Sequence, residues 1–170
     1  MPRPKALFIG QAPPFKQVAL PFGRTHLYKW LASVGIDQET ALSSFAFAAL
    51  AQKFPGRNGR ADVVPSPAIL QQDRPILLEL IQQLQPPIIV PVGALSIREV
   101  LQQPQLALKD AVGRQFIHKP FGLATFPETI IIPLPHPSGA STWQYLGDNK
   151  VLLRQALVLL KKAVDDLDTG

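Results

Sequence analysis

The sequence predicts an α/β fold, a three-layer α/β/α sandwich around a central, mainly parallel sheet of four strands. Short apolar runs that are rich in β-branched residues are typical of buried strands. These runs alternate along the chain with longer segments whose apolar residues recur at helical spacing. Strands that alternate with helices form a parallel sheet that is covered on both faces. The length of 170 residues suits one core, so we expect a single domain over residues 1–170.

The predicted strands are short apolar segments, and the last of them runs directly into a proline-rich stretch. Proline stops a strand ladder because it has no N–H to donate. A further stretch, residues 116–126, is interpreted as an irregular hairpin. The four strand segments, in chain order, are residues 6–10, 45–51, 88–92 and 130–134.

Four segments have helical periodicity. The clearest of them is expected to begin with Asp73 as its N-cap, with Pro75 in its first turn, and to end before Pro86 and Pro87. Gly35 can supply the left-handed residue that ends the first helix. The four segments are residues 25–34, 73–85, 93–101 and 148–167.

Composition narrows the class of protein. Hydrophobic residues make up 46% of the chain and charged residues 17%, which is typical of a folded globule. The formal net charge of +5 favours an anionic partner, although an ordinary basic protein would have the same charge. The chain has no cysteine, which excludes disulfides, thiolate catalysis and clusters held by cysteine. His26 and His118 have no ligand-spaced partners, so no metal and no cofactor is expected.

No apolar run reaches the length of a membrane span, and the first residues contain no long apolar segment of the signal-peptide kind. We therefore expect a cytoplasmic protein that does not bind membranes.

The last predicted strand leads into a candidate functional histidine. Its apolar residues are followed by Pro133 and Pro135, and then by His136, Pro137 and Ser138. Ligands of open α/β sheets bind at the carboxyl ends of the strands, which is where His136 is expected to lie. The alternative is that the prolines only turn the chain and His136 caps a local segment.

The first strand also ends in a marked stretch, Gly10-Gln11-Ala12-Pro13-Pro14, and Pro21-Phe22-Gly23 follows before the first helix. Together with the late His-Pro-Ser, this ordered set resembles the uracil-DNA glycosylase superfamily. The likeness is greatest to its iron–sulfur and related thermophile-type branches, and it spans residue 8 to about residue 160. The resemblance implies a base-excision repair enzyme that flips a damaged base, uracil or another deaminated base, and hydrolyses its N-glycosidic bond.

The resemblance also implies roles for individual residues. His136 would hydrogen-bond the departing base as charge develops on it, and Phe22 would stack on that base. Gln11 would position the attacking water, since it stands where the iron–sulfur branch has a glutamate. The alternative for Phe22 is a core residue that anchors the loop. Gly10, Ala12, Pro13 and Ala48 would shape the base pocket, with Ala12 and Ala48 standing where relatives have an aspartate and an asparagine.

A DNA partner, damaged or single-stranded, is implied as well, and with it an association with the nucleoid. Ser138 would contact a phosphate, or else cap the segment after Gly139. The loop with Lys53, Arg57 and Arg60 would neutralise phosphates, or else be a solvated turn. Trp143 would wedge into the space left by the base, or else pack the last helix on the sheet.

Two other functions stay open at this point. The absence of an acid at residues 11 and 12 fits a catalytically silent DNA-binding relative. The alanine at residue 48 fits a hydrolase of another nucleobase or nucleotide. An esterase is disfavoured because the chain has no Gly-x-Ser-x-Gly elbow.

Overall fold

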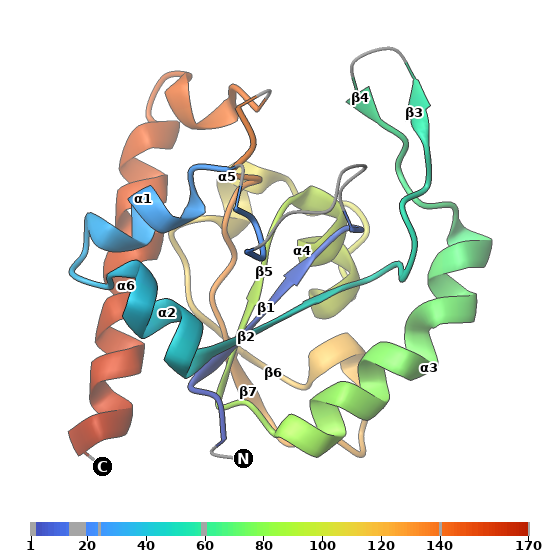
Figure 1. The fold of residues 1–170 in the computed structure, drawn as a ribbon, viewed down its shortest axis with the longest axis horizontal. Coiled ribbons are helices and arrows are strands. Elements are labelled where there is room, and N and C mark those ends of the chain that lie inside the picture. Colours follow the sequence, from blue (N-terminus) through green and yellow to red (C-terminus); the bar gives the residue numbers. More distant parts are fainter. Residues whose placement is uncertain (1–2, 14–19, 24, 59–60, 140, 170) are drawn as a thin grey trace.

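The computed structural model describes residues 3–13, 20–23, 25–58, 61–139 and 141–169. It has the predicted three-layer α/β/α architecture, with a mostly parallel sheet between two layers of helices (Figure 1). The sheet has five strands in place of the four predicted, in the order β2-β1-β5-β7-β6. In chain order these strands are β1 Ala6–Gly10, β2 Phe45–Ala49, β5 Ile88–Pro91, β6 Phe116–His118 and β7 Thr129–Ile131.

The fifth strand corrects the hairpin expected within residues 116–126. β6 pairs antiparallel with β7, whereas the short 3-10 helix η1, Pro120–Gly122, lies between them. The hairpin therefore has β7 as its second arm. β7 is also shorter than predicted, but the chain beyond it stays beside β5 as far as a parallel bridge between Val92 and Leu134.

The central strand β1 shows why the sheet is covered on both faces. Every residue of β1 is buried, and successive side chains of a strand point to opposite faces. Ala6 and Phe8 belong to one hydrophobic core, and Leu7 and Ile9 to the other. An unbroken apolar run is what a strand needs when helices pack on both of its sides.

The first core lies under three helices, α1 Leu27–Ala32, α2 Gln38–Ser44 and α6 Asn149–Thr169. The second lies under α3 Pro67–Leu84 and α4 Ala94–Leu101, together with η1. The sequence analysis did not predict α2 or the short helix α5, Leu108–Ala111. Asp37 caps α2 by accepting a hydrogen bond from the backbone N–H of Thr40.

Helix α3 begins earlier than predicted. Its N-cap is Ser66, whose hydroxyl accepts from the backbone N–H of Ile69, and Pro67 occupies the first turn. Asp73 is therefore not a cap but a buried residue inside the helix, and Pro75 also lies inside it. The prediction was wrong because the apolar stripe that includes Leu70 continues on the N-terminal side of Asp73.

Between β2 and α3 the chain forms a small hairpin, β3 Arg57–Asn58 and β4 Ala61–Asp62, where the sequence predicted an irregular loop. The hairpin stands away from the helical layers, above the N-terminal end of α3 in the view of Figure 1. It therefore forms one side of the edge at which the parallel strands end.

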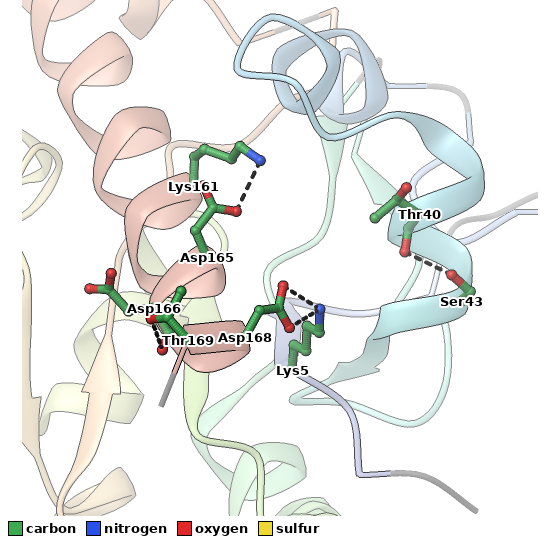
Figure 2. Close-up of polar contacts among 8 residues, drawn as sticks. All are labelled: Lys5, Thr40, Ser43, Lys161, Asp165, Asp166, Asp168 and Thr169. Atoms are coloured by element: carbon green, nitrogen blue, oxygen red, sulfur yellow. Dashed lines mark hydrogen bonds and ion pairs between the residues drawn. The ribbon is translucent and has the colours of Figure 1, made fainter.

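At the opposite end of the sheet, an ion pair joins the residue before β1 to α6. Lys5, which precedes β1, lies 2.7 Å from the carboxylate of Asp168 near the end of α6 (Figure 2). Lys161 pairs with Asp165 on the same helix at 3.0 Å. These contacts are exposed and contribute little stability each, but they show that the C-terminal helix ends far from the carboxyl edge of the sheet.

None of the helices within the described ranges has both the length and the apolarity of a membrane span.

Candidate active site

A cavity of about 910 Å³ opens at the carboxyl edge of the sheet. Gly10, the last residue of β1, and His136, which follows the bridge at Leu134, both line it. The two residues lie 126 positions apart in the sequence (136 − 10), and the parallel order of β1, β5 and β7 brings them to the same edge. This is the crevice in which α/β proteins bind their ligands.

Gly10 and Phe22 are in direct contact. A Cβ atom on residue 10 would lie 2.9 Å from Cζ of the Phe22 ring, closer than carbon atoms can approach. Phe22 also packs against Phe47 of β2, with ring centroids 6.3 Å apart. The ring is half-buried and lines the cavity, so glycine at residue 10 lets an aromatic face form the floor beside β1.

The turn that carries Phe22 is held by its own hydrogen bonds. Phe22 has a φ of 55°, a left-handed conformation that is uncommon for a bulky residue. Its carbonyl oxygen accepts from both the hydroxyl, at 2.6 Å, and the backbone N–H of Thr25. The Tyr28 hydroxyl donates to the Pro21 carbonyl oxygen at 2.6 Å, and burial raises the pKa of Tyr28, so the phenol keeps its proton. These bonds keep the ring in place despite the strained backbone.

The imidazole of His136 is oriented by the chain that follows it. The backbone N–H of Ser138 donates to Nδ1 of His136 at 3.2 Å. Since Nδ1 accepts this bond, the neutral ring carries its hydrogen on Nε2. His136 itself is part of the cavity lining.

A glycine also lies beside this ring. Gly93, which follows β5, has a φ of 90°, and a Cβ on it would lie 3.5 Å from Cδ2 of His136. The position before α4 therefore needs a residue that tolerates a positive φ, as glycine does. This position lies directly against the ring of His136.

One backbone bond joins the two motif-bearing loops. The N–H of His26, just after the Phe22 turn, donates to the carbonyl oxygen of Pro137 at 2.9 Å. This main-chain contact helps to hold the aromatic ring and the histidine relative to each other. Such a site is preorganised, since little has to be ordered when a ligand binds.

Most of the predicted site residues meet at this cavity. Besides Gly10, Phe22 and His136, its lining includes Ala12, Pro13, Ala48, Ser138 and Arg57. Ala48 lies beside β1, in register with Ile9. These residues of the cavity come from five separate stretches of the chain.

The comparison with protein families adds the deciding observation. A family profile described as the uracil DNA glycosylase superfamily matches residues 1–161, nearly the whole chain. The chain belongs to the uracil-DNA glycosylase superfamily. A comparison with curated proteins finds no match. Membership implies glycosylase-type chemistry in DNA repair and a DNA substrate, and it bears out both the predicted family and the predicted class of fold.

Some predicted residues of this glycosylase-family protein lie elsewhere. Gln11 is half-buried, and its backbone oxygen accepts from the N–H of Ala51, but the residue is not part of the cavity lining. Lys53 is exposed and also lies outside the lining. Trp143, in the 3-10 helix η2 Trp143–Tyr145, packs against the core under α6. Arg60 lies outside the described residues.

The iron–sulfur branch of the superfamily holds its cluster with cysteines, and this chain has none. Within the described ranges, no three His, Cys, Asp or Glu side chains gather as metal ligands would. The residues of this chain therefore do not fit such a cluster, and the branch to which the protein belongs stays a prediction.

The sequence analysis missed one whole wall of the cavity. Helix α3 contributes Ile76, Leu77, Glu79, Leu80 and Gln83 to the lining, and Gln52 lies beside them. Glu79 is the one carboxylate among the described lining residues, and Gln83 Nε2 lies 3.5 Å from its Oε1. Nothing in the helical pattern marks these polar residues, because Glu79 and Gln83 occupy ordinary exposed positions of an amphipathic helix.

Buried Asp73 joins the α3 wall to the sheet. Its carboxylate accepts the backbone N–H of Gln52 at 2.8 Å, just after β2, and the side chain is only 8% exposed. A hydrogen bond to a buried carboxylate is stronger than a neutral one, so this contact fixes the distance between α3 and the end of β2.

Proposed function

We propose that this protein is a monofunctional DNA glycosylase, which takes a damaged base out of the helix and hydrolyses the bond between that base and its sugar. The observation that carries the proposal is the orientation of His136. Its Nδ1 accepts from the Ser138 N–H, which places the hydrogen of the neutral ring on Nε2, and the residue lines the same cavity as Phe22. Family membership supports the same class of reaction.

In the proposed reaction, the bond between C1′ of the sugar and the base nitrogen breaks, and its electron pair leaves with the base. Water adds its oxygen to C1′ and gives up a proton, and the departing base takes up a proton. His136 stabilises the negative charge that develops on the base by donating from Nε2. A preorganised donor of this kind is worth roughly 3–4 kcal/mol of the barrier.

The base must first leave the stack, which costs a few kcal/mol and requires a close-fitting site. Stacking on the Phe22 ring offsets part of that cost, roughly 1–3 kcal/mol per base. The ring is well suited to this role because Gly10 and Phe47 support it on the protein side.

The weakest part of the site is the activation of water. The chain between Gly10 and Pro13 offers no carboxylate, and Gln11 would reach the water only through its neutral amide. General-base help is typically worth about a hundred- to ten-thousand-fold. When the bond to the base is largely broken before water attacks, the water needs little activation, so slow activity survives the loss of the acid.

The rim of the cavity would bind the DNA backbone. Arg57 lines the cavity beside the β3–β4 hairpin, and Ser138 lies next to the histidine, so both are placed to meet phosphates near a flipped nucleotide. For the wedge that fills the gap in the DNA helix, Tyr145 and Leu146 are more accessible candidates than Trp143. They are 64% and 58% exposed, whereas Trp143 packs on the core.

Single-turnover cleavage of labelled single- and double-stranded oligonucleotides tests the proposal. The substrates carry uracil, hypoxanthine, xanthine or a mismatched base. His136→Ala should lower the rate roughly 100- to 1,000-fold, the usual loss when one such donor is removed. His136→Gln, which keeps an amide donor near the position of Nε2, should retain part of the activity. His118→Ala is the control, because His118 is at the opposite end of β7, beside Thr129.

A catalytically silent DNA-binding relative is the second candidate, favoured by the absence of an acid between Gly10 and Pro13. If no base is released while the protein still binds DNA, this reading replaces the proposal. If cleavage occurs and His136→Ala equals the parent protein, the role assigned to His136 is wrong. Gln11→Glu and Ala12→Asp should raise a measurable rate by restoring a carboxylate.

A further inference from the structure

We propose that the cavity selects a deaminated purine, hypoxanthine or xanthine, over uracil, and that Glu79 and Gln83 of α3 read the far edge of that base. The inference rests on the proposed glycosylase function and adds the class of base to it. It depends on the lining residues that α3 contributes, and these residues belong to none of the motifs identified in the sequence.

The lining of the cavity includes both Phe22 and residues of α3. The Phe22 turn packs on the core that lies under α1, and α3 packs on the opposite face of the sheet. The cavity therefore crosses the carboxyl ends of β1 and β2 from one helical layer to the other. Its volume of about 910 Å³ stands near the upper end of the range of roughly 300–1,000 Å³ for small-molecule sites.

Five of the lining residues at the ends of β1 and β2 have small side chains or none. They are Gly10, Ala12, Ala48, Ala49 and Ala51. A one-ring base that stacks on Phe22 beside His136 would leave the α3 side unfilled, and lining atoms without a partner lose their dispersion contacts. A base of two fused rings extends further toward α3. The shape of the cavity thus favours a purine.

The chemistry of the α3 wall selects among purines. A carboxylate such as Glu79 only accepts hydrogen bonds, whereas the Gln83 amide can donate. The two groups are adjacent, with Gln83 Nε2 donating to Glu79 Oε1 across 3.5 Å, and a base would meet the second amide hydrogen of Gln83 and the second oxygen of Glu79. Together they present a donor next to an acceptor, which matches the carbonyl O6 and the N1–H of a deaminated purine. Adenine has the reverse order, an N6 donor beside the N1 acceptor.

The strand β2 itself offers no lining side chain that could hydrogen-bond a base. Phe47, Ala48 and Ala49 line it, and none of them has a polar side-chain atom. A uracil beside β2 would therefore have no polar side chain of that strand to read its edge. A site that hydrogen-bonds one base and not another can discriminate strongly, because its polar groups lose their partners with the wrong base.

The distance across the cavity is held by Asp73. The bond from the Gln52 N–H to Asp73 fixes α3 beside the end of β2, and Glu79 and Gln83 follow on the same helix. The reading groups therefore stand on a rigid element, which specificity requires. Undamaged guanine has the same O6 and N1–H edge, but its strong pairing with cytosine raises the cost of flipping.

The test uses duplexes that differ only in the target base, which is uracil, hypoxanthine, xanthine or adenine. Single-turnover release and equilibrium binding are both measured for the parent protein, Glu79→Gln and Glu39→Gln. We expect the parent to release hypoxanthine and xanthine about tenfold or more faster than uracil. Glu79→Gln should lower release of both purines roughly 10- to 100-fold, because a hydrogen bond to a charged group is lost, and should leave uracil unchanged. Glu39→Gln, an exposed residue of α2, should match the parent.

A second variant tests the size of the cavity. Ala48→Leu should narrow the space beside Gly10 and lower purine release more than uracil release. Preference of the parent for uracil, or equal loss with every base in Glu79→Gln, would overturn the inference. If no base is released at all, the proposed hydrolysis fails, and the binding measurement still decides the base class. Tighter binding of the purine duplexes that depends on Glu79 supports the inference, and equal binding overturns it.

Discussion

The two walls of the cavity are built in different ways. The strand-end wall consists of loops that follow β1 and β7, and its main residues, Phe22 and His136, are positioned by hydrogen bonds of the neighbouring backbone. The α3 wall consists of one face of an 18-residue helix, which packs on the second hydrophobic core and is also joined to the end of β2 by the buried carboxylate of Asp73. Chemistry is thus assigned to the loops and base selection to the helix.

The difference teaches how such a site can change its substrate. A donor and a stacking ring have to lie close to the reacting atoms, so the loops that hold them allow little variation. Residues on the exposed face of a helix can change without disturbing the core beneath, because their backbone is satisfied within the helix. Substitutions on α3 should therefore alter which base is taken and leave the reaction itself intact.

The largest effect is expected from the strand-end wall. Phe22→Ala should lower single-turnover release of every base roughly 5- to 150-fold, the rate equivalent of the loss of about 1–3 kcal/mol of stacking. Phe22→Tyr keeps the ring and should stay close to the parent protein. A loss confined to one base would mean that Phe22 belongs to selection and that the division between the walls is wrong.

Loss of the contact that joins α3 to the end of β2 should mainly lower the stability of the folded protein. Asp73→Ala leaves the Gln52 N–H without its acceptor and should lower the free energy of unfolding by about 1–3 kcal/mol, as measured by urea denaturation. Asp73→Asn keeps an oxygen acceptor and should lose less. If Asp73→Ala unfolds at the same urea concentration as the parent, α3 does not depend on this contact.

The smallest effect is expected at the rim, which belongs to neither wall. Arg57→Ala should weaken DNA binding similarly for all sequences and should reduce the slope of log affinity against log salt by about 1. The double variant with Arg60→Ala should reduce the slope further. Lys162→Ala, near the end of α6, is the control and should leave the slope unchanged. An unchanged slope in Arg57→Ala would show that the hairpin is only a solvated turn.

The sequence by itself determined the class of fold and the strand-end wall. Buried strands need unbroken apolar runs, and glycines, prolines and a histidine directly after such runs interrupt the pattern visibly, so Gly10, Phe22 and His136 could be found from their own surroundings. The resemblance to the glycosylase family rests on the same interruptions, and the match over residues 1–161 confirms it.

Only the tertiary structure decided the rest. Asp73 looked like a helix cap because local pattern cannot tell a capping aspartate from a buried one that accepts a backbone N–H from residue 52. The strand β6 needs β7 as its partner, and Glu79 belongs to the cavity only because α3 packs beside the end of β2. The physical reason is the same in each case. These features depend on contacts between residues that are distant in the chain. Such contacts cannot be inferred from the spacing of residues within one short segment.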